Sequence, residues 1–203
     1  MLKKIIFVFI AFLLLFFLYK FFNQKKSVVE ISNQPMLLKK HSLAFNESIA
    51  ALMIQYIAIK DAFVDADTTA VKSKTASFIN LLNNIDTAEL KHDTASVYET
   101  VVFTLNDIRS NALSLMSQKS IVEMRKDFSS MTDVMYPSLF YALNYEGPTL
   151  YLQNCPMAID DSLPANWISN HAEVVNPYLG KNHPTYKSSM LHCGELKDSI
   201  VAK

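Results

Sequence analysis

The sequence is poor in glycine and cysteine and has no excess of either charge. Its 203 residues include three glycines, two cysteines and one tryptophan. So few glycines argue against Gly-rich phosphate-binding loops and against an all-β fold with many tight turns. Nineteen basic residues balance nineteen acidic ones. The chain therefore lacks the basic surplus that holds a phosphate backbone, and we expect no nucleic-acid partner.

Half of the residues are apolar, enough for one domain with its own core. The longest apolar run lies at the start, from Ile5 to Phe22, interrupted only by Lys20. As a helix this run is about 27 Å long, close to the roughly 30 Å of a hydrocarbon core. A cleaved signal peptide has a shorter apolar region followed by a small-residue cleavage site, and residues 21–26 offer no such site. We therefore predict that residues 1–24 are an uncleaved, single-pass transmembrane helix.

Four helical patterns follow a polar linker at residues 25–35. In each pattern apolar residues recur three and four positions apart, which places them on one face of a helix. The residues predicted to face the core are Phe45, Ile49, Leu52, Tyr56, Ile59 and Phe63 in the first helix (about 36–64), Val71, Phe78, Leu82 and Ile85 in the second, Val97, Val101, Leu105, Ile108, Ala112 and Leu115 in the third (about 88–116), and Met124, Phe128, Met131, Met135 and Leu139 in the fourth (about 121–143). Pro137 should kink the fourth helix or end its regular part. The short connections predict a mainly α fold, an up-down four-helix bundle over residues 36–145.

The helical pattern stops after Asn144. The segment 146–203 holds both cysteines and the tryptophan. Gly147-Pro148 marks a turn, and residues 149–153 and 166–168 are candidates for short strands. So short a segment buries little area by itself. We expect a small, irregular, partly β C-terminal appendage that packs on the bundle, is cross-linked, or holds a metal ion.

Two parts of this appendage carry soft ligands at alternating positions. Cys155 and Met157 are two residues apart, and so are Met190 and His192, so the members of each pair share a face of an extended chain. Cys193 follows directly. If the two parts meet, sulfur and imidazole groups surround one point, and such donors favour copper(I). The candidate metal ligands are Cys155, Met157, Met190, His192 and Cys193.

Other interpretations of the cysteines stay open. In an oxidising compartment two cysteines usually form a disulfide, and closing the loop between Cys155 and Cys193 would stabilise the fold by about 4 kcal/mol. The protein would then be a structural or interaction module without a metal. A zinc site made of both cysteines, His192 and His183 is a weaker alternative, because the spacing matches no standard zinc pattern. The remaining interpretation is that both cysteines are buried free thiols.

Several motifs of the chain resemble, in their order, a family called domain of unknown function 3347. They are Cys155-Pro156-Met157-Ala158, Ala165-x-Trp167-Ile168-Ser169, Asn176-Pro177-Tyr178-x-Gly180, Met190-x-x-Cys193-Gly194 and, in the fourth helix, residues 123–129. Members of that family occur as stand-alone envelope proteins or fused to periplasmic adaptor subunits of copper and silver efflux pumps. The resemblance implies that the chain binds or handles a heavy metal, chiefly copper, outside the cytoplasm.

The other motif residues are predicted to support this site. Trp167 and Tyr178 are expected to anchor the appendage on the bundle, and Asn176 and Pro177 to form a rigid turn. Gly194 would let the backbone turn sharply beside the cysteine that precedes it. No nucleophile has a persuasive neighbouring base, so we predict no enzymatic activity. The apolar run predicts a single-pass membrane protein, and the resemblance implies an inner-membrane location with the soluble part in the periplasm and efflux-system components as candidate partners.

Overall fold

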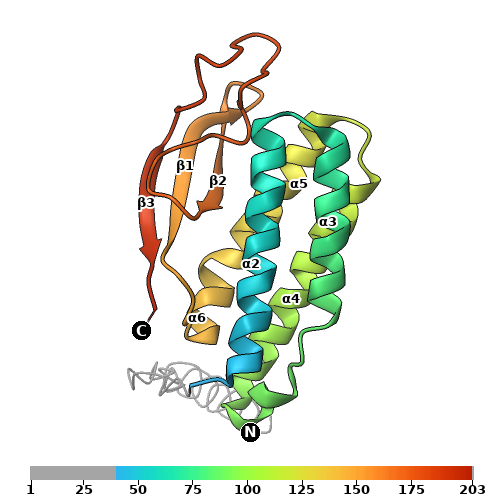
Figure 1. Cartoon of the computed structure of the whole chain (residues 1–203), viewed down its shortest axis with the longest axis vertical. Coiled ribbons are helices and arrows are strands. Elements are labelled where there is room, and N and C mark those ends of the chain that lie inside the picture. Colours follow the sequence, from blue (N-terminus) through green and yellow to red (C-terminus); the bar gives the residue numbers. More distant parts are fainter. Residues whose placement is uncertain (1–39, 203) are drawn as a thin grey trace, which may run out of the picture. The chain divides into compact units, whose positions relative to one another are not determined.

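The four predicted helices are present in the computed structural model, which describes residues 40–202 (Figure 1). They run alternately in opposite directions and pack against one another. In chain order they are α2 (Leu43–Val64), α3 (Thr68–Asn83), α4 (Ala95–Ser117) and α5 (Ile121–Val134). The apolar residues predicted to face the core are buried, apart from the half-buried Ile85. The prediction of a mainly helical chain is therefore confirmed.

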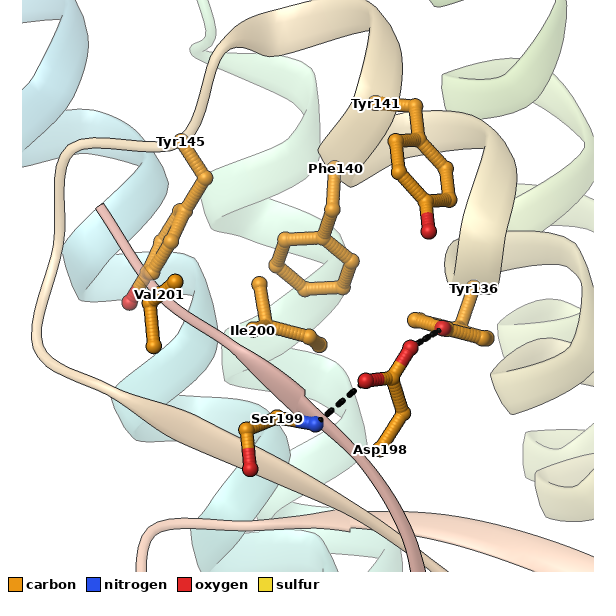
Figure 2. Close-up of a pocket in the computed structure, with 8 residues that line it drawn as sticks. All are labelled: Tyr136, Phe140, Tyr141, Tyr145, Asp198, Ser199, Ile200 and Val201. Carbon is orange, nitrogen blue, oxygen red and sulfur yellow. Dashed lines mark hydrogen bonds between the residues drawn. The ribbon is translucent and has the colours of Figure 1, made fainter. Parts of the chain in front are cut away.

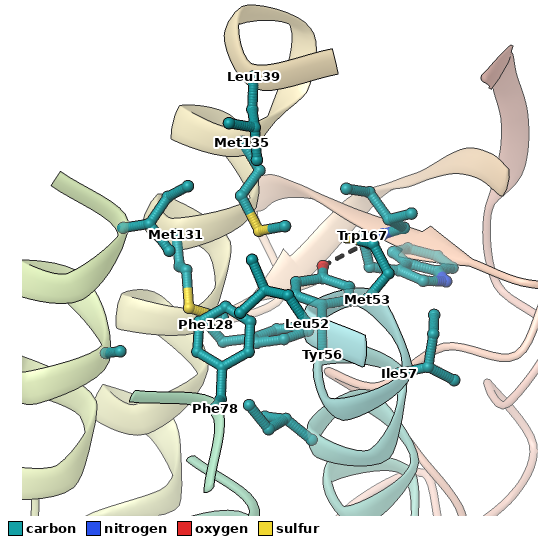
Figure 3. Packing of buried hydrophobic residues seen from close by; sticks show 14 of the residues in the cluster. Leu52, Met53, Tyr56, Ile57, Phe78, Phe128, Met131, Met135, Leu139 and Trp167 are labelled. Carbon is teal, nitrogen blue, oxygen red and sulfur yellow. Dashed lines mark hydrogen bonds between the residues drawn. The ribbon is translucent and has the colours of Figure 1, made fainter. Parts of the chain in front are cut away.

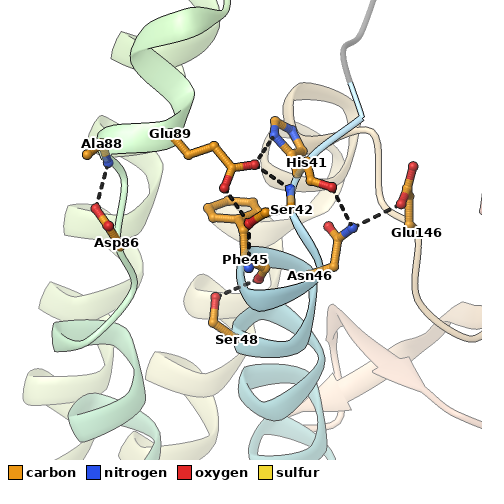
Figure 4. A network of polar contacts seen from close by, with 9 residues as sticks. All are labelled: His41, Ser42, Phe45, Asn46, Ser48, Asp86, Ala88, Glu89 and Glu146. Carbon is orange, nitrogen blue, oxygen red and sulfur yellow. Dashed lines mark hydrogen bonds and ion pairs between the residues drawn. The ribbon is translucent and has the colours of Figure 1, made fainter.

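The start of α2 is fixed to the connection between α3 and α4. Ser42 caps α2, because its hydroxyl oxygen accepts a hydrogen bond from the N–H of Phe45. The backbone N–H and the hydroxyl of Ser42 in turn donate to the carboxylate of Glu89 (Figure 4). Glu89 lies in a short 3-10 helix, η1 (Ala88–His92). This contact holds together two segments that are far apart in the sequence.

Two helices begin later than the sequence suggests. The periodicity predicts the first helix from about residue 36, whereas residues 40–42 are not helical and α2 begins at Leu43. It predicts the third helix from residue 88, whereas α4 begins at Ala95. The reason is the side chain of Thr94, which accepts a hydrogen bond from the N–H of Val97 and caps a new helix there.

Pro137 ends the regular part of the fourth helix, as predicted. α5 stops at Val134, and a π-helical turn, η2 (Met135–Leu139), and the short α6 (Phe140–Leu143) follow. Proline has no N–H to donate within a helix, and its ring clashes with the preceding turn. The chain leaves α6 through Asn144, whose left-handed φ of 45° ends the helix.

A three-stranded antiparallel sheet follows the helices. Its strands are β1 (Leu150–Ile159), β2 (Leu163–Ser169) and β3 (Glu195–Ile200), in the order β2-β1-β3. Asp160 and Asp161 join β1 to β2 with left-handed φ values of 50° and 57°, which aspartate tolerates better than most residues. The sequence does not predict β3, because its first five residues are exposed and the apolar alternation that marks a strand is missing.

A row of buried aromatic rings joins the helices to the sheet. Tyr56 of α2 stacks on Phe128 of α5, with 5.1 Å between ring centroids. Phe128 lies 6.1 Å from Tyr178, which lies 6.0 Å from Trp167 of β2. The Tyr56 hydroxyl also accepts a hydrogen bond from the backbone N–H of Ile168 in β2 (Figure 3). Trp167 and Tyr178 thus lie at the contact between appendage and helices.

The predicted transmembrane helix over residues 1–24 and the linker over residues 25–35 lie outside the described residues. Among residues 40–202, no helix combines the length and the apolar character that crossing a membrane requires.

Candidate thiol site

The strand register brings the two cysteines to the same end of the sheet. Cys155 lies on the central strand β1, opposite Ala165 of β2, and is fully buried. On the other edge of β1, pairing with β3 ends where Asn154 faces Glu195. Cys193 lies two residues before Glu195, so the antiparallel chain delivers it beside the next part of β1. The half-buried Cys193 thiol therefore meets the buried Cys155 thiol.

Gly194 makes this close approach of the two chain segments possible. Its φ is +138°, a conformation that other residues rarely adopt. A Cβ atom at this position would lie 2.6 Å from the carbonyl oxygen of Asn154 and 2.9 Å from the ring of Trp167. Any side chain here would push Cys193 away from β1.

The two thiols lie close enough to interact, and both are free of disulfide bonds. Burial raises the pKa of Cys155 to about 11, and the contact with Cys193 adds to the rise. The backbone N–H of Met157 and the side chain of Asn176 favour the thiolate and oppose the rise. Cys155 is therefore protonated at neutral pH, and an ion that binds thiolate would have to displace its proton.

Asn176 holds the chain that carries Cys193. Its side chain is fully buried, and its amide nitrogen donates a 2.8 Å hydrogen bond to the backbone carbonyl of Cys193. Its amide oxygen accepts from the N–H groups of Tyr178 and Leu179 at 2.8 and 3.0 Å. Its backbone N–H donates to the carbonyl of Leu191. One asparagine thus fixes the loop that contains the predicted rigid turn to the segment that contains Cys193.

Met157 and Met190 belong to the same two chain segments as the cysteines. Both are half-buried and pack against the buried cluster. The backbone N–H of Met157 lies near the Cys155 sulfur and favours its thiolate, and the Met190 carbonyl accepts from the N–H of Cys193 at 3.0 Å. The contacts that tie these two residues to the cysteines therefore run through the backbone.

His192 does not join the cysteines, contrary to the prediction. Its side chain is exposed, and its Nδ1 lies 2.7 Å from the carbonyl oxygen of Val174 and 3.9 Å from a carboxylate oxygen of Glu173. Nδ1 of His183 accepts from two backbone N–H groups, at Thr185 and at Tyr186. Within residues 40–202, no group of three or more His, Cys, Asp or Glu side chains is placed to share a metal ion. The described residues of the zinc alternative are therefore not all brought together, and sulfur is the ligand type that the site offers.

Two buried polar residues that the sequence does not single out support the site. Gln153 of β1 is fully buried, and its amide nitrogen donates to the carbonyls of His171, Ala172 and Glu173 at 3.0, 3.1 and 3.0 Å. These bonds hold the turn that leads from β2 toward Asn176. A glutamine at the end of a predicted strand gives no sign of this role, because the same residue is common on exposed strands.

Arg125 of α5 is the second such residue. Its guanidinium is buried and donates to the carbonyls of Pro177 and Phe63, each at 3.2 Å. It thereby ties the turn at Pro177 to the C-terminal end of α2, where exposed carbonyls attract a cation. Burial lowers the pKa of Arg125 to about 10. The sequence feature that could have indicated this role is the position of Arg125, three residues before Phe128 and therefore on the apolar side of the helix.

The helical part of the chain matches one known protein family. The family model described as Protein of unknown function (DUF3347) matches residues 52–142. The chain carries a DUF3347 segment. The resemblance to this family is thereby confirmed, and the DUF3347 match runs from within α2 to α6. The cysteine motifs lie beyond it, in the sheet and its loops. No curated protein and no solved structure matches the chain.

Proposed function

We propose that this protein binds a soft metal ion, copper(I), through the thiols of Cys155 and Cys193. The observation that supports the proposal is the contact between these two thiols, which come from segments far apart in the sequence. Soft thiolate and thioether ligands select copper(I) over the harder divalent ions. The surrounding core keeps Cys155 away from water, which favours a site that holds its ion in an apolar environment.

The thioethers of Met157 and Met190 are proposed as additional ligands. Met157 follows Cys155 by two residues, Met190 precedes Cys193 by three, and both pack at the edge of the same core. A thioether carries no charge, so it can approach a buried ion without adding a desolvation cost of its own. His192 is left out, because its ring nitrogen lies against the Val174 carbonyl.

Binding at this site would be coupled to proton release. The raised pKa of Cys155 keeps its thiol protonated at neutral pH, and the metal binds the thiolate. The affinity for copper(I) should therefore rise with pH over the range in which at least one cysteine loses a proton when the ion binds. This coupling would let an acidic compartment release the ion.

We place the protein in the cell envelope on the strength of its sequence. The apolar run in residues 1–24 supports a membrane anchor, and the DUF3347 resemblance supports a periplasmic location and efflux-system components as partners. The function proposed is metal handling without catalysis, in support of copper homeostasis or efflux.

The test is a titration of the reduced full-length chain with copper(I) in the presence of a competing chelator. We expect one ion per chain, and we expect Cys155→Ser or Cys193→Ser to weaken binding at least about 10–100-fold, the cost of disturbing a metal site. Met116→Leu in α4 is the matched control, since it removes a half-buried thioether from a helix that lies apart from the sheet. Unchanged binding in both serine variants would refute the proposal.

The same thiol contact supports a second candidate, a structural or interaction module without a metal. Two adjacent thiols in an oxidising compartment can form a disulfide that holds the end of the sheet closed. Counting free thiols in protein taken from its native compartment separates the two. A complete disulfide that copper(I) does not disturb favours the module, and two free thiols that copper(I) protects from alkylation favour the metal site.

A further inference from the structure

A cavity lined by aromatic rings and a carboxylate lies at the end of β3 opposite the thiols. Its volume is about 140 Å³. Figure 2 shows its lining, which comes from the segment around α6 and from β3. The residues that matter for its chemistry are Tyr136, Phe140, Tyr141, Tyr145, Asp198 and Ile200. Because Leu150 pairs with Ile200 while Asn154 pairs with Glu195, the cavity and the thiols lie at opposite ends of the same strand pair.

The four rings around this cavity are inclined to one another. Phe140 and Tyr145 meet edge to face, with centroids 5.3 Å apart and planes at 86°. Tyr136 and Tyr141 lie 6.3 Å apart with planes at 47°. All four rings contribute to the lining of the cavity. The face of an aromatic ring is its electron-rich side and attracts a cation.

The carboxylate of Asp198 adds a negative charge to this wall. It accepts hydrogen bonds from the Tyr136 hydroxyl and from the backbone N–H of Ser199 (Figure 2). The Tyr136 bond is the main cause that lowers the pKa of Asp198. Both donors are neutral, and none of the ion pairs among residues 40–202 includes Asp198. The charge of this carboxylate is therefore not balanced by a neighbouring cation.

We propose that this cavity binds a small organic cation with an alkylated ammonium group. Ring faces attract the charge, methyl groups fill the apolar space beside Ile200, and Asp198 balances the charge. The volume is several times the roughly 30 Å³ of one water, but smaller than the roughly 300 Å³ of a typical drug-sized pocket. The cavity therefore fits a head group, and an anion would meet both the carboxylate and the electron-rich rings.

The test compares choline with 3,3-dimethyl-1-butanol, a neutral molecule of the same shape, in titrations of the full-length chain followed by NMR. We expect choline to bind at least about tenfold more tightly, since shape and apolar area are matched and the charge alone differs. Asp198→Asn should weaken choline binding about tenfold and leave the neutral molecule unaffected. Tyr141→Leu should weaken choline binding roughly three- to tenfold. Phe103→Leu is the control, because Phe103 is an exposed aromatic residue of α4 outside this cavity.

Equal binding of the two molecules would overturn the proposal, because the cavity would then be merely apolar. So would the absence of choline binding, or choline binding that Asp198→Asn leaves unchanged. Glycerophosphocholine distinguishes the source of the cation. If it binds as choline does, the ligand is a phosphocholine head group, and if choline alone binds, it is a free alkylammonium compound. Neither experiment depends on the cysteines, so its result is independent of the proposed copper site.

Discussion

The side-chain amide of Asn176 and the backbone carbonyl of Cys193 are joined by a 2.8 Å hydrogen bond across the loop that closes the sheet. The same side chain accepts from two backbone N–H groups and reaches the sulfur of Cys155. One buried residue therefore fixes the segment that carries Cys193 and lies beside the thiol of Cys155.

Replacing Asn176 by alanine should increase the mobility of the segment that carries Cys193 more than it destabilises the helices. It leaves the Cys193 carbonyl and two N–H groups without their partners, so we expect a loss of about 2–3 kcal/mol in the free energy of unfolding. Cys193 should also react faster with a maleimide in the folded state. Chemical denaturation and the rate of thiol modification are the measurements. The exposed Asn170→Ala is the matched control, and an unchanged modification rate in Asn176→Ala would contradict the role assigned to this residue.

Gly194→Ala should separate the cysteines. The new Cβ would lie 2.6 Å from a backbone oxygen of Asn154, and the φ of +138° is unfavourable for alanine. We expect a destabilisation of about 2 kcal/mol or more. Mild oxidation should then form less of the Cys155–Cys193 disulfide than in the unchanged chain. The readout is the fraction of alkylated thiols, and efficient disulfide formation in the variant would show that Gly194 does not control the approach.

Cys155 should make the reduced protein less stable at alkaline pH. Its pKa rises from the ordinary value of 9.0 to about 11 in the folded state, so between these values the unfolded chain loses its proton first. The stability that this thiol contributes is complete below about pH 9 and is lost toward pH 11. The loss between about pH 8.5 and 10.5 should be roughly 1–2 kcal/mol.

Urea unfolding at both pH values measures this loss, and Cys155→Ser is the comparison because it retains the tyrosines that also titrate in this range. The difference in stability between the two proteins should change with pH. A constant difference would mean that the pKa of Cys155 is the same in the folded and unfolded states.

Tyr56→Phe should weaken the attachment of the sheet to the helices. The Tyr56 hydroxyl is buried, lies 2.6 Å from Thr132 Oγ1 and accepts from the N–H of Ile168 at 3.2 Å. Without it that N–H has no partner, which should cost about 1–2 kcal/mol. Hydrogen exchange at the Ile168 amide should accelerate, while exchange at the centre of α4 should follow only the change in global stability. An Ile168 amide that stays as protected as α4 would contradict this attachment.

The helices could be predicted from the sequence because their evidence is local. The apolar residues from Phe45 to Phe63 recur with the period of a helix and so predict α2. Pro137 predicts the end of α5, because proline cannot continue a regular helix. The late starts of α2 and α4 could not be predicted from periodicity, because capping by Ser42 and Thr94 decides them. β3 was missed because its sequence is polar and its place as an edge strand depends on pairing with β1.

The site shows the same division between local and distant information. The residue types of Cys155 and Cys193 suggest the hypothesis that the two thiols meet. The register between β1 and β3 is what brings them together. His192 was wrongly included, because alternation places it beside Met190 only in extended chain, whereas residues 190–193 form a turn. Gln153 and Arg125 went unnoticed, because their backbone acceptors come from parts of the chain that only the fold brings near.

X-ray absorption at the copper edge of the reduced, copper(I)-loaded full-length chain tests the central claim most directly. We predict an inner shell of sulfur atoms alone, at least two per copper ion, that is lost in the Cys155→Ser, Cys193→Ser double variant. A shell dominated by nitrogen or oxygen, or a sulfur shell that survives in the double variant, would contradict the claim that these two thiols share one ion.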